Sequence, residues 1–366
     1  MKSWYDWKDR INKKSGFQFG INYTALYLNS SKVISDENNP NTASGIIDIY
    51  VGWNFINRKA DKNKGKFFIK FTGRHSYGGD ELTSPQDHGL KESGYYGLSG
   101  TGFNDFSARI FELNYQQLFA NNRLGFVVGK IDLTNYFNFH GLSIPSQHFI
   151  GYGSSNTGTG NWGNPGLGGV FMVRPAKEIY VLASVVDVYG DLYQDGDFFD
   201  LGQHWENGDL MYMGEIGYFP DFKERFDKRI SLMGWISDEY VSVGGDQIAR
   251  GEGLAFSAHW LFRERYMPYL GIGFSNGAGE NTFYKKDIQI GHGIRFKRYD
   301  ILGTSFSWAE TNIAESKDQM TVEVFYRYNI TSHFEITADF QYIVNPTLNP
   351  TEGGFSYWGL RGRLKL

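Results

Sequence analysis

The sequence predicts an all-β fold, a transmembrane antiparallel β-barrel of about 16 strands with an inward-folded constriction loop and a short N-terminal helix. Three observations predict it: a repeated alternation of apolar and polar residues, connections that alternate between short and long, and an aromatic, glycine-rich composition. The 366 residues include 30 Phe, 24 Tyr, 9 Trp and 46 Gly but only 9 Pro. Because a barrel alternates lipid-facing and lumen-facing residues, a mean hydropathy of −0.42 is compatible with a membrane protein.

Composition excludes several classes of protein. With 41% hydrophobic residues the chain is not disordered, and without cysteine it is not a disulfide scaffold. No stretch approaches the ~20 consecutive apolar residues of a membrane helix. A net charge of −4 provides no general basic face, so nucleic acid is not an expected partner. The remaining candidates are the barrel, one large soluble β domain and two sandwich domains.

The first element is a helix over residues 1–14, which we expect at the periplasmic mouth of the barrel. Trp4, Trp7 and Ile11 are spaced by three and four residues and form one apolar stripe. No apolar run follows Met1, so an exported protein would already have lost its signal peptide. An intact cytosolic N-terminus is the alternative that the rest of the sequence must exclude.

Residues 15–366 form a single barrel in this interpretation. Apolar and polar residues alternate along the first strand, where Phe17, Phe19 and Ile21 share one face. The expected strands lie near 17–27, 47–55, 66–72, 111–116, 124–128, 168–175, 178–190, 210–220, 228–238, 252–263, 266–276, 286–297, 299–309, 318–330, 333–345 and 355–366. Many approach the ~9–11 residues that cross a bilayer, whereas strands of globular proteins average nearer 5–6 residues.

The connections between these strands alternate in length. The short ones are 57–65, 120–123, 175–177, 220–229, 262–266, 296–299 and 331–332. The long ones are 29–44, 76–104, 131–166, 191–209, 238–251, 276–285, 310–319 and 345–354. Short turns at one end and long loops at the other are typical of outer-membrane barrels, and a two-sheet sandwich has no reason to sort its loops in this way.

The polar face of the strands would line an aqueous lumen, which a barrel of this size encloses. The inward candidates on the strands include Asp48, Lys70, Asn114, Gln116 and Arg363. Those selected as predicted site residues are Glu112, Lys130, Glu215, Arg295, Glu323, Arg327, Asp339, Gln341 and Arg361. Acids, bases and amides are mixed, whereas an anion pore should carry a dominant basic ladder. The mixture suits a neutral solute rich in hydroxyl groups. Alternatively, individual charges are only solvated or mutually paired wall residues.

The 131–166 segment is the candidate constriction loop, since it is far too long for a simple connection. It contains Tyr136, Phe137, Phe139, His140, His148, Phe149, Tyr152 and Trp162. Such a loop is expected to fold into the barrel, where its rings either stack on sugars or only pack the loop against the wall. We expect its residues Asp132, Asn135 and Tyr136 to approach the wall residues Glu323, Arg327 and Arg361 across the lumen. In that case Arg327→Ala would increase cation preference.

Catalytic and metal-binding patterns are weak. The eight histidines are scattered, and neither an HExxH nor a GxSxG motif occurs, so we predict no catalytic residue, cofactor or metal site. Asp187, Asp191, Asp195, Asp197 and Asp200 lie in an acidic stretch that lacks the register of a known calcium loop. A structural calcium ion in the 187–200 stretch is the alternative.

Several segments resemble the carbohydrate-selective outer-membrane porin family of the OprB type. The resemblance is carried by WYDWKDRINKKSGFQFGINYTALY at the N-terminus, VGKIDLTNYFN and NPGLGGVFMVRP in the middle, and ITSHFEITADFQYIVNPTLNP with GLRGRLKL at the C-terminus. The matching positions are Gly129, Lys130, Ile131, Asp132 and Leu133, then Asp339, Gln341, Tyr342, Asn345 and Pro346. One departure is the C-terminus, because this chain ends in Leu364-Lys365-Leu366 whereas such barrels usually end in Phe or Trp.

The resemblance implies a passive diffusion channel in the bacterial outer membrane for mono- and small oligosaccharides. Its partners would be small sugars in the lumen and the lipids and lipopolysaccharide around it, as a monomer or alternatively a trimer. Three other functions stay open: a general or anionic-metabolite porin, an outer-membrane enzyme and an adhesive barrel. A basic constriction would favour acids, and a plugged lumen would favour adhesion.

Overall fold

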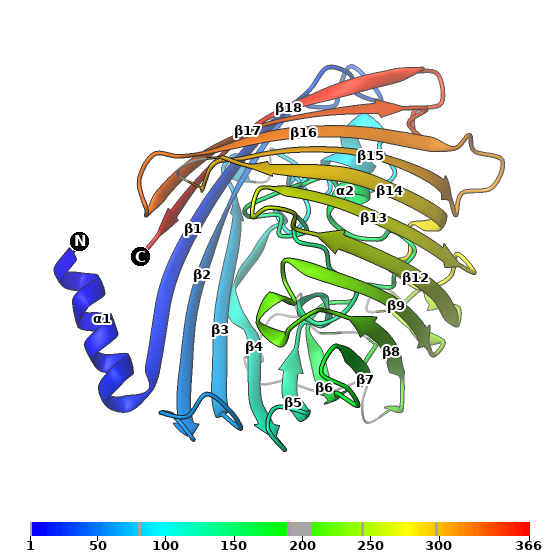
Figure 1. The fold of residues 1–366 in the computed structure, drawn as a ribbon. Coiled ribbons are helices and arrows are strands. Elements are labelled where there is room, and N and C mark those ends of the chain that lie inside the picture. Colours follow the sequence, from blue (N-terminus) through cyan, green and yellow to red (C-terminus); the bar gives the residue numbers. More distant parts are fainter. Residues whose placement is uncertain (1, 80–81, 189, 191–206, 243–244, 297–298) are drawn as a thin grey trace.

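The computed structural model describes residues 2–79, 82–188, 190, 207–242, 245–296 and 299–366. Within these residues, sixteen antiparallel strands close into one barrel, and two further strands pair as a separate ribbon. Each barrel strand pairs with its neighbour in the chain, and the first pairs with the last (Figure 1). The predicted antiparallel barrel of 16 strands is confirmed.

The barrel strands are longer than those of most globular sheets. They are β1 (Phe17–Ser30), β2 (Asn41–Ile56), β3 (Gly65–Ser76), β4 (Phe106–Phe119), β5 (Leu124–Ile131), β6 (Gly166–Val173), β7 (Ile179–Asp187), β8 (Leu210–Tyr218), β9 (Lys228–Ser237), β12 (Gly251–Trp260), β13 (Tyr266–Ser275), β14 (Tyr284–Arg295), β15 (Ile301–Thr311), β16 (Gln319–Asn329), β17 (Phe334–Val344) and β18 (Gly354–Lys365). The ribbon consists of β10 (Tyr240–Val241) and β11 (Gln247–Ile248).

The first and last strands close the ring without an edge. Tyr23 lies opposite Leu364, and Thr24 lies opposite Arg363. The C-terminal residue takes part in the closure, because the Leu366 N–H donates to the Ile21 carbonyl at 2.8 Å and the Ile21 N–H donates back at 3.1 Å. The closure therefore satisfies the backbone groups that an open sheet would expose to lipid.

Most connections sort by length between the two ends of the barrel, as the sequence predicts. One end carries the short turns 57–64, 120–123, 174–178, 219–227, 261–265, 296–300 and 330–333. The other end carries the longer loops, of which 77–105 and 132–165 extend furthest along the chain. We refer to these two ends as the turn end and the loop end.

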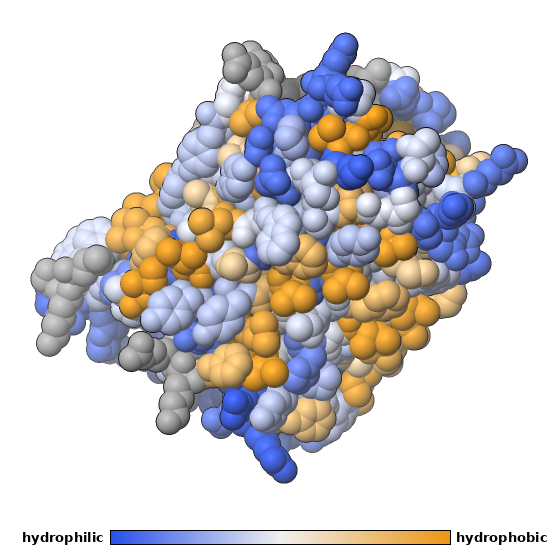
Figure 2. Space-filling view, turned by 90° about the horizontal axis from the view of Figure 1, so that it is seen from above, coloured by the Kyte–Doolittle hydropathy of each residue, from blue (hydrophilic) through white to orange (hydrophobic). Residues whose placement is uncertain are grey.

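The barrel wall is inverted relative to a soluble protein, with polar side chains buried inside and apolar side chains exposed outside. In β16, Glu323 is fully buried whereas the adjacent Val322 and the nearby Tyr326 are exposed. Figure 2 shows apolar side chains spread over one outer face, with hydrophilic side chains toward its margins. This is the surface that a lipid-embedded barrel presents.

Helix α1 (Lys2–Ser15) lies outside the barrel beside β1 (Figure 1). Its apolar stripe packs on the strand, because Trp4 and Trp7 place their rings 5.8 and 5.4 Å from the ring of Phe19. At the turn end, the Tyr5 hydroxyl donates to the Lys365 carbonyl at 2.9 Å. No helix in the part of the chain that the structure describes is long and apolar enough to cross a membrane.

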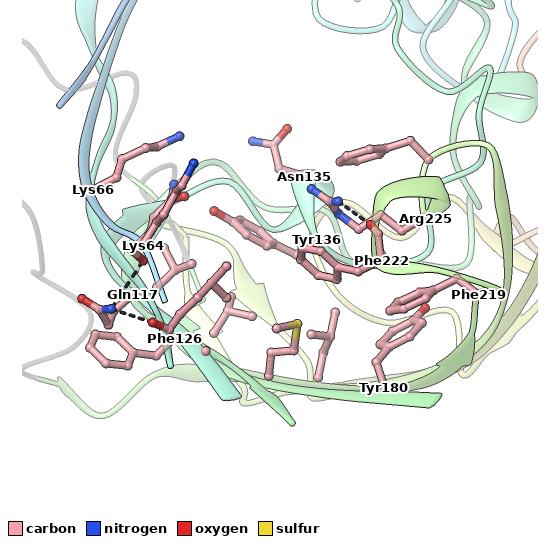
Figure 3. A pocket seen from close by; sticks show the side chains of 18 of the residues that line it. Lys64, Lys66, Gln117, Phe126, Asn135, Tyr136, Tyr180, Phe219, Phe222 and Arg225 are labelled. Atoms are coloured by element: carbon pink, nitrogen blue, oxygen red, sulfur yellow. Dashed lines mark hydrogen bonds between the residues drawn. The ribbon is translucent and has the colours of Figure 1, made fainter. Parts of the chain in front are cut away.

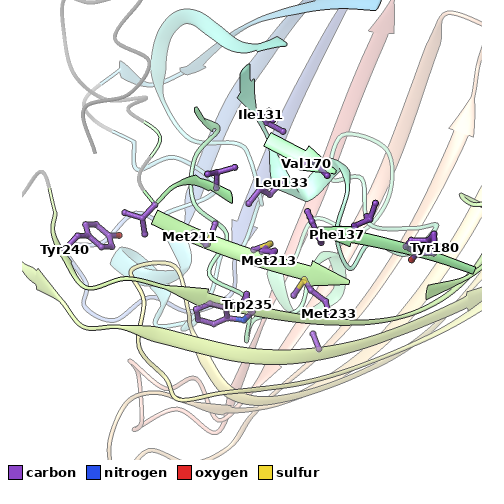
Figure 4. Close-up of a cluster of buried hydrophobic side chains, with 14 of the residues drawn as sticks. Ile131, Leu133, Phe137, Val170, Tyr180, Met211, Met213, Met233, Trp235 and Tyr240 are labelled. Carbon is purple, nitrogen blue, oxygen red and sulfur yellow. The ribbon is translucent and has the colours of Figure 1, made fainter. Parts of the chain in front are cut away.

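One part of the inner wall is apolar and forms a core with the 132–165 loop. Met211 and Met213 of β8 and Trp235 of β9 point inward and are almost fully buried. Ile131, at the end of β5, and Phe137, in the loop, pack against them (Figure 4). Burial of each such side chain contributes about 1.5–3 kcal/mol, so this core draws the loop into the lumen.

Candidate functional site

The 132–165 loop enters the barrel directly after β5 and first contacts the adjacent wall. The Asp132 carboxylate caps a short 3-10 turn by accepting the Thr134 N–H at 3.0 Å. The Asn135 side chain then donates to Glu112 of β4 at 3.2 Å. One step further, the Asn138 N–H donates to the buried Glu215 carboxylate of β8 at 2.7 Å.

A buried ion pair supports this first part of the loop. Arg229 of β9 pairs with Glu215, and its guanidinium also donates to the Tyr136 carbonyl at 2.9 Å. The Tyr180 hydroxyl donates to the same carboxylate at 2.7 Å. The group is buried beneath the loop, and its hydrogen bonds offset the desolvation of both charges.

The middle of the loop crosses to the opposite wall, where charged side chains bind its backbone. Arg361 of β18 donates to the Pro145 carbonyl and, at 2.8 Å, to the His148 carbonyl. Arg327 of β16 donates to the Gln147 carbonyl at 3.3 Å. Glu323 accepts the Ile150 N–H at 2.7 Å and the N–H of the next residue at 3.1 Å. These charges satisfy buried backbone groups that would otherwise lack partners.

The last part of the loop returns along β15 and β14. Ser154, in helix α2 (Tyr152–Ser155), shares a 2.7 Å hydrogen bond with Ser305 of β15. Asp287 of β14 accepts the Gly158 N–H and the Thr157 hydroxyl, both at 3.1 Å through Oδ2. The loop is thereby fixed to the inner wall over most of its length.

The expected approach of Asp132, Asn135 and Tyr136 to the late strands, by which we mean β14–β18, requires correction. Asn135 contacts β4, and the Tyr136 carbonyl contacts β9, whereas Arg327 and Arg361 bind residues 145–148. The reason is chain continuity. Residues 132–136 follow β5 immediately and reach only the wall between β4 and β9, so about ten more residues are needed to cross the lumen.

The 77–105 loop also folds over the late strands, which the sequence interpretation did not anticipate. Gln341 of β17 donates to the Ser99 carbonyl at 3.0 Å, and the Gln319 side chain bonds both the N–H and the carbonyl of Tyr96 at 3.1 and 3.2 Å. His88 lies 2.9 Å from the Tyr357 hydroxyl of β18, and burial lowers the pKa of this histidine. The two loops therefore cover most of the late-strand wall together.

Two histidines of the 132–165 loop are buried in neutral form. His140 accepts the Leu142 N–H through Nδ1 at 3.2 Å and donates through Nε2 to the Ser154 carbonyl at 3.1 Å. Burial, with a smaller effect of nearby His259, lowers the pKa of His140 to about 3. Burial and the neighbouring Arg327 and Arg361 likewise hold the pKa of His148 well below its usual value. Protonation of either ring would oppose the inserted position of the loop.

An open cavity of about 450 Å³ remains along the β1–β4 wall, and we call it the eyelet. Its lining residues come from four strands and from the start of the 132–165 loop. They are Asn22, Asp48, Tyr50, Lys66, Phe68, Lys70, Glu112, Gln116, Asn135 and Tyr136. Two acids, two bases, three amides and three rings thus face the same space.

The charges of the eyelet are compensated locally. Lys70 lies 3.4 Å from Asp48, which also accepts the Thr72 hydroxyl at 2.7 Å. Glu112 accepts from Asn135, and Lys66 lies over the Phe68 ring at 5.0 Å. Polar donors, acceptors and aromatic faces alternate over short distances, an arrangement that can bind hydroxyl groups and ring faces weakly at several points.

A second cavity, of about 340 Å³, adjoins the eyelet toward the turn end (Figure 3). It shares Lys66, Gln116, Asn135 and Tyr136 with the eyelet. Its other walls are the inner faces of β5–β7 and the 219–227 turn. We call it the turn-side cavity.

The structure separates the twelve predicted site residues into two groups. Glu112, Asn135 and Tyr136 line the eyelet. The other nine do not line it. Lys130 is buried at the end of β5, Asp132 caps the 3-10 turn, and Arg295 forms an ion pair with Asp227. The remaining six are buried wall residues, most of which bind loop backbone: Glu215, Glu323, Arg327, Asp339, Gln341 and Arg361.

Seven eyelet residues were not among the twelve predicted site residues. Asp48, Lys70 and Gln116 were expected to face the lumen, whereas four others, Asn22, Tyr50, Lys66 and Phe68, were not singled out. All four lie on the polar side of the strand alternation, so that pattern could have identified them. Of the acidic 187–200 stretch, Asp191, Asp195, Asp197 and Asp200 lie outside the described residues.

Comparison with protein families identifies the chain. Its sequence matches the family described as carbohydrate-selective porin, OprB family, over residues 18–260 and 293–366. The chain belongs to this family. It is therefore a porin of the bacterial outer membrane, and both its family and its fold are those of channels.

Solved structures agree with this assignment at the level of the fold. The high-pH structure of Pseudomonas putida OprB superposes with a TM-score of 0.76 at 13% identity, covering 100% of this chain and 97% of that one. The outer-membrane channel DcaP of Acinetobacter baumannii superposes with a TM-score of 0.57 at 10% identity, covering 96% and 97%. Among curated protein sequences there is no significant match.

Proposed function

We propose that neutral sugars cross this porin along the β1–β4 wall, through the eyelet. The observation that carries this route is the composition of the eyelet, in which Asp48 and Glu112 offset Lys66 and Lys70. Along the late-strand wall, the described side chains Glu323, Arg327 and Arg361 bind loop backbone instead of facing an open cavity.

The balance of charge favours neutral over charged solutes. A lining with one dominant sign would attract ions of the opposite sign and hold them. Here each solute hydroxyl can donate to a carboxylate or amide oxygen and accept from a lysine or an amide. The faces of Tyr50, Phe68 and Tyr136 offer apolar contact for the C–H face of a sugar ring.

We propose that the turn end faces the periplasm and that helix α1 lies there, because short turns occupy that side of outer-membrane barrels. The exposed apolar belt would contact membrane lipid, with lipopolysaccharide around the loop end. One barrel contains the whole proposed route, so the monomer would be the functional unit, and a trimer would be three independent channels. Solutes would pass without a chemical step.

Liposome swelling tests the proposed preference. Purified protein reconstituted into liposomes should admit glucose faster than gluconate, which has a similar size but carries a charge. A graded series of larger sugars would then define the size limit of the eyelet. Equal or faster entry of gluconate would contradict the proposal and favour an anionic-metabolite channel.

A pair of variants connects this preference to the eyelet. Asp48→Asn removes one carboxylate with little change of shape, so the eyelet becomes net positive. The rate of gluconate entry should therefore rise relative to that of glucose. Asp9→Asn, on helix α1 outside the barrel, removes the same charge and should leave the ratio unchanged. If Asp48→Asn leaves the ratio of gluconate to glucose entry unchanged, the selective step lies outside the eyelet.

A further inference from the structure

The turn-side cavity differs from the eyelet in charge although the two cavities adjoin. Lys64, Lys66, Arg225 and Arg229 line it, and no Asp or Glu is among the described residues that line it. Of these four cations, Arg229 is already paired with buried Glu215. Lys64, Lys66 and Arg225 form no ion pair with any residue that the structure describes.

The carboxylates nearest along the chain to Arg225 are engaged elsewhere. Glu224 binds Lys228 at 2.8 Å, Asp227 binds Arg295 at 2.8 Å, and Asp221 lies 4.0 Å from Lys177. Burial and two neighbouring guanidinium groups, Arg229 and Arg174, lower the pKa of Arg225. The half-buried guanidinium is therefore in a positive environment that a bound anion would relieve.

The rest of the lining is apolar and rich in rings. Val170, Met172 and Leu182 project from β6 and β7, and Phe219 and Phe222 come from the 219–227 turn. Figure 3 shows Lys64 and Lys66 on one side of the cavity and Arg225 on the other, with Tyr136 between them. A sugar here would lose hydrogen bonds to water without finding a carboxylate to accept its hydroxyl protons.

We propose that the turn-side cavity is a binding site for a monocarboxylate that carries an aromatic ring. The carboxylate would bind Arg225 or the side chains of Lys64 and Lys66, and the ring would pack on Tyr136 and the apolar wall. A volume of about 340 Å³ lies at the lower end of the range for small-molecule sites, which fits a single ring. This site goes beyond the proposed sugar route, because it binds a different class of solute.

Binding in a neutral detergent tests the site without any requirement for conduction. Fluorine NMR would titrate the purified protein with 4-fluorobenzoate, with empty micelles subtracted. We expect saturable binding that is about tenfold tighter than that of 4-fluorobenzyl alcohol, which keeps the ring but lacks the charge. Acetate, which has the charge without the ring, should not compete at the same concentration.

Matched variants assign the site. Arg225→Gln should weaken 4-fluorobenzoate binding about tenfold. Lys223→Gln, an exposed residue in the same turn but outside the lining, should leave it unchanged. Heat-modifiable gel migration checks the folding of both, and Lys64→Gln replaces Arg225→Gln if that variant does not fold.

Three results would overturn the proposal: no saturable binding, equal binding of the neutral alcohol, or equal weakening by Lys223→Gln. The first two results would mean that the ligand only partitions into apolar surroundings. The third would mean that binding depends only on the net charge of the protein. Liposome swelling tests the sugar route, and fluorine NMR tests this site. Either proposal can therefore fail while the other holds.

Discussion

The β1–β4 wall and the β14–β18 wall present the same residue types inward but use them differently. On the first wall, Asp48 and Lys70 face the open eyelet. On the second wall, Glu323 and Arg361 are fully buried and bind loop backbone. The difference arises from what covers each wall, since the 77–105 and 132–165 loops both pack against the late strands.

This contrast shows that a charged side chain pointing into a barrel does not necessarily contact the solute. A carboxylate or guanidinium beneath a loop must have hydrogen-bond partners, and the buried N–H and carbonyl groups of that loop need them equally. The late-strand charges therefore position the constriction, whereas the early-strand charges meet the solute. The following predictions test this division.

The largest expected effect is on the anchoring of the 132–165 loop. Glu323→Ala removes the acceptor of the Ile150 and Gly151 amides, which lie 2.7 and 3.1 Å from it. We expect a loss of about 3 kcal/mol in the free energy of unfolding, together with a larger and noisier single-channel conductance as the loop loosens. Denaturant unfolding in detergent and planar-bilayer recording measure the two effects.

Glu310→Ala is the matched control on the neighbouring strand β15. Glu310 binds Lys286 at 2.6 Å, but both side chains are substantially exposed. The loss in the free energy of unfolding should therefore stay below about 1 kcal/mol. If Glu310→Ala changed stability or conductance as much as Glu323→Ala, the distinction between anchoring and surface charges would be lost.

Acid should destabilise the inserted loop through His140. The pKa of about 3 in the folded protein lies below the usual 6.5, so the unfolded chain binds more protons between these values. The stability contributed by neutral His140 is therefore complete above about pH 6.5, falls as the pH drops, and levels off below about pH 3. At pH 5 this linkage amounts to about 2 kcal/mol.

Unfolding at pH 7 and pH 5 checks this prediction. His140→Gln cannot gain the proton, so the difference between the two pH values should shrink by the same amount in that variant. His333→Gln is a control, because this half-buried histidine lies in the 330–333 turn and stacks on Tyr5 of helix α1 rather than on the inserted loop. An unchanged pH dependence in His140→Gln would mean that other groups govern the acid response.

The alternation of residues was sufficient to predict the strands, the direction of each face and the sorting of the connections. The path of the inserted loop was not predictable in the same way. Its length and aromatic content indicated insertion, but which wall it covers depends on Met211, Met213 and Trp235, whose inward position is set by the register of β8 and β9. Tertiary packing of this kind leaves no periodic signal in the loop itself.

The smallest expected effect compares one cation from each wall. Lys70→Ala removes a charge that faces the eyelet, so the cation-to-anion permeability ratio should rise about threefold, as expected for a partly solvated charge of this kind. Arg327→Ala removes a charge that is buried and donates to the Gln147 carbonyl at 3.3 Å, so it should alter the ratio less and instead increase conductance fluctuations. Reversal potentials in a salt gradient measure both variants under the same conditions. A shift for Arg327→Ala that equals or exceeds that of Lys70→Ala would place Arg327 in the ion path, and the late-strand wall would then be part of the pore rather than the support of its loop.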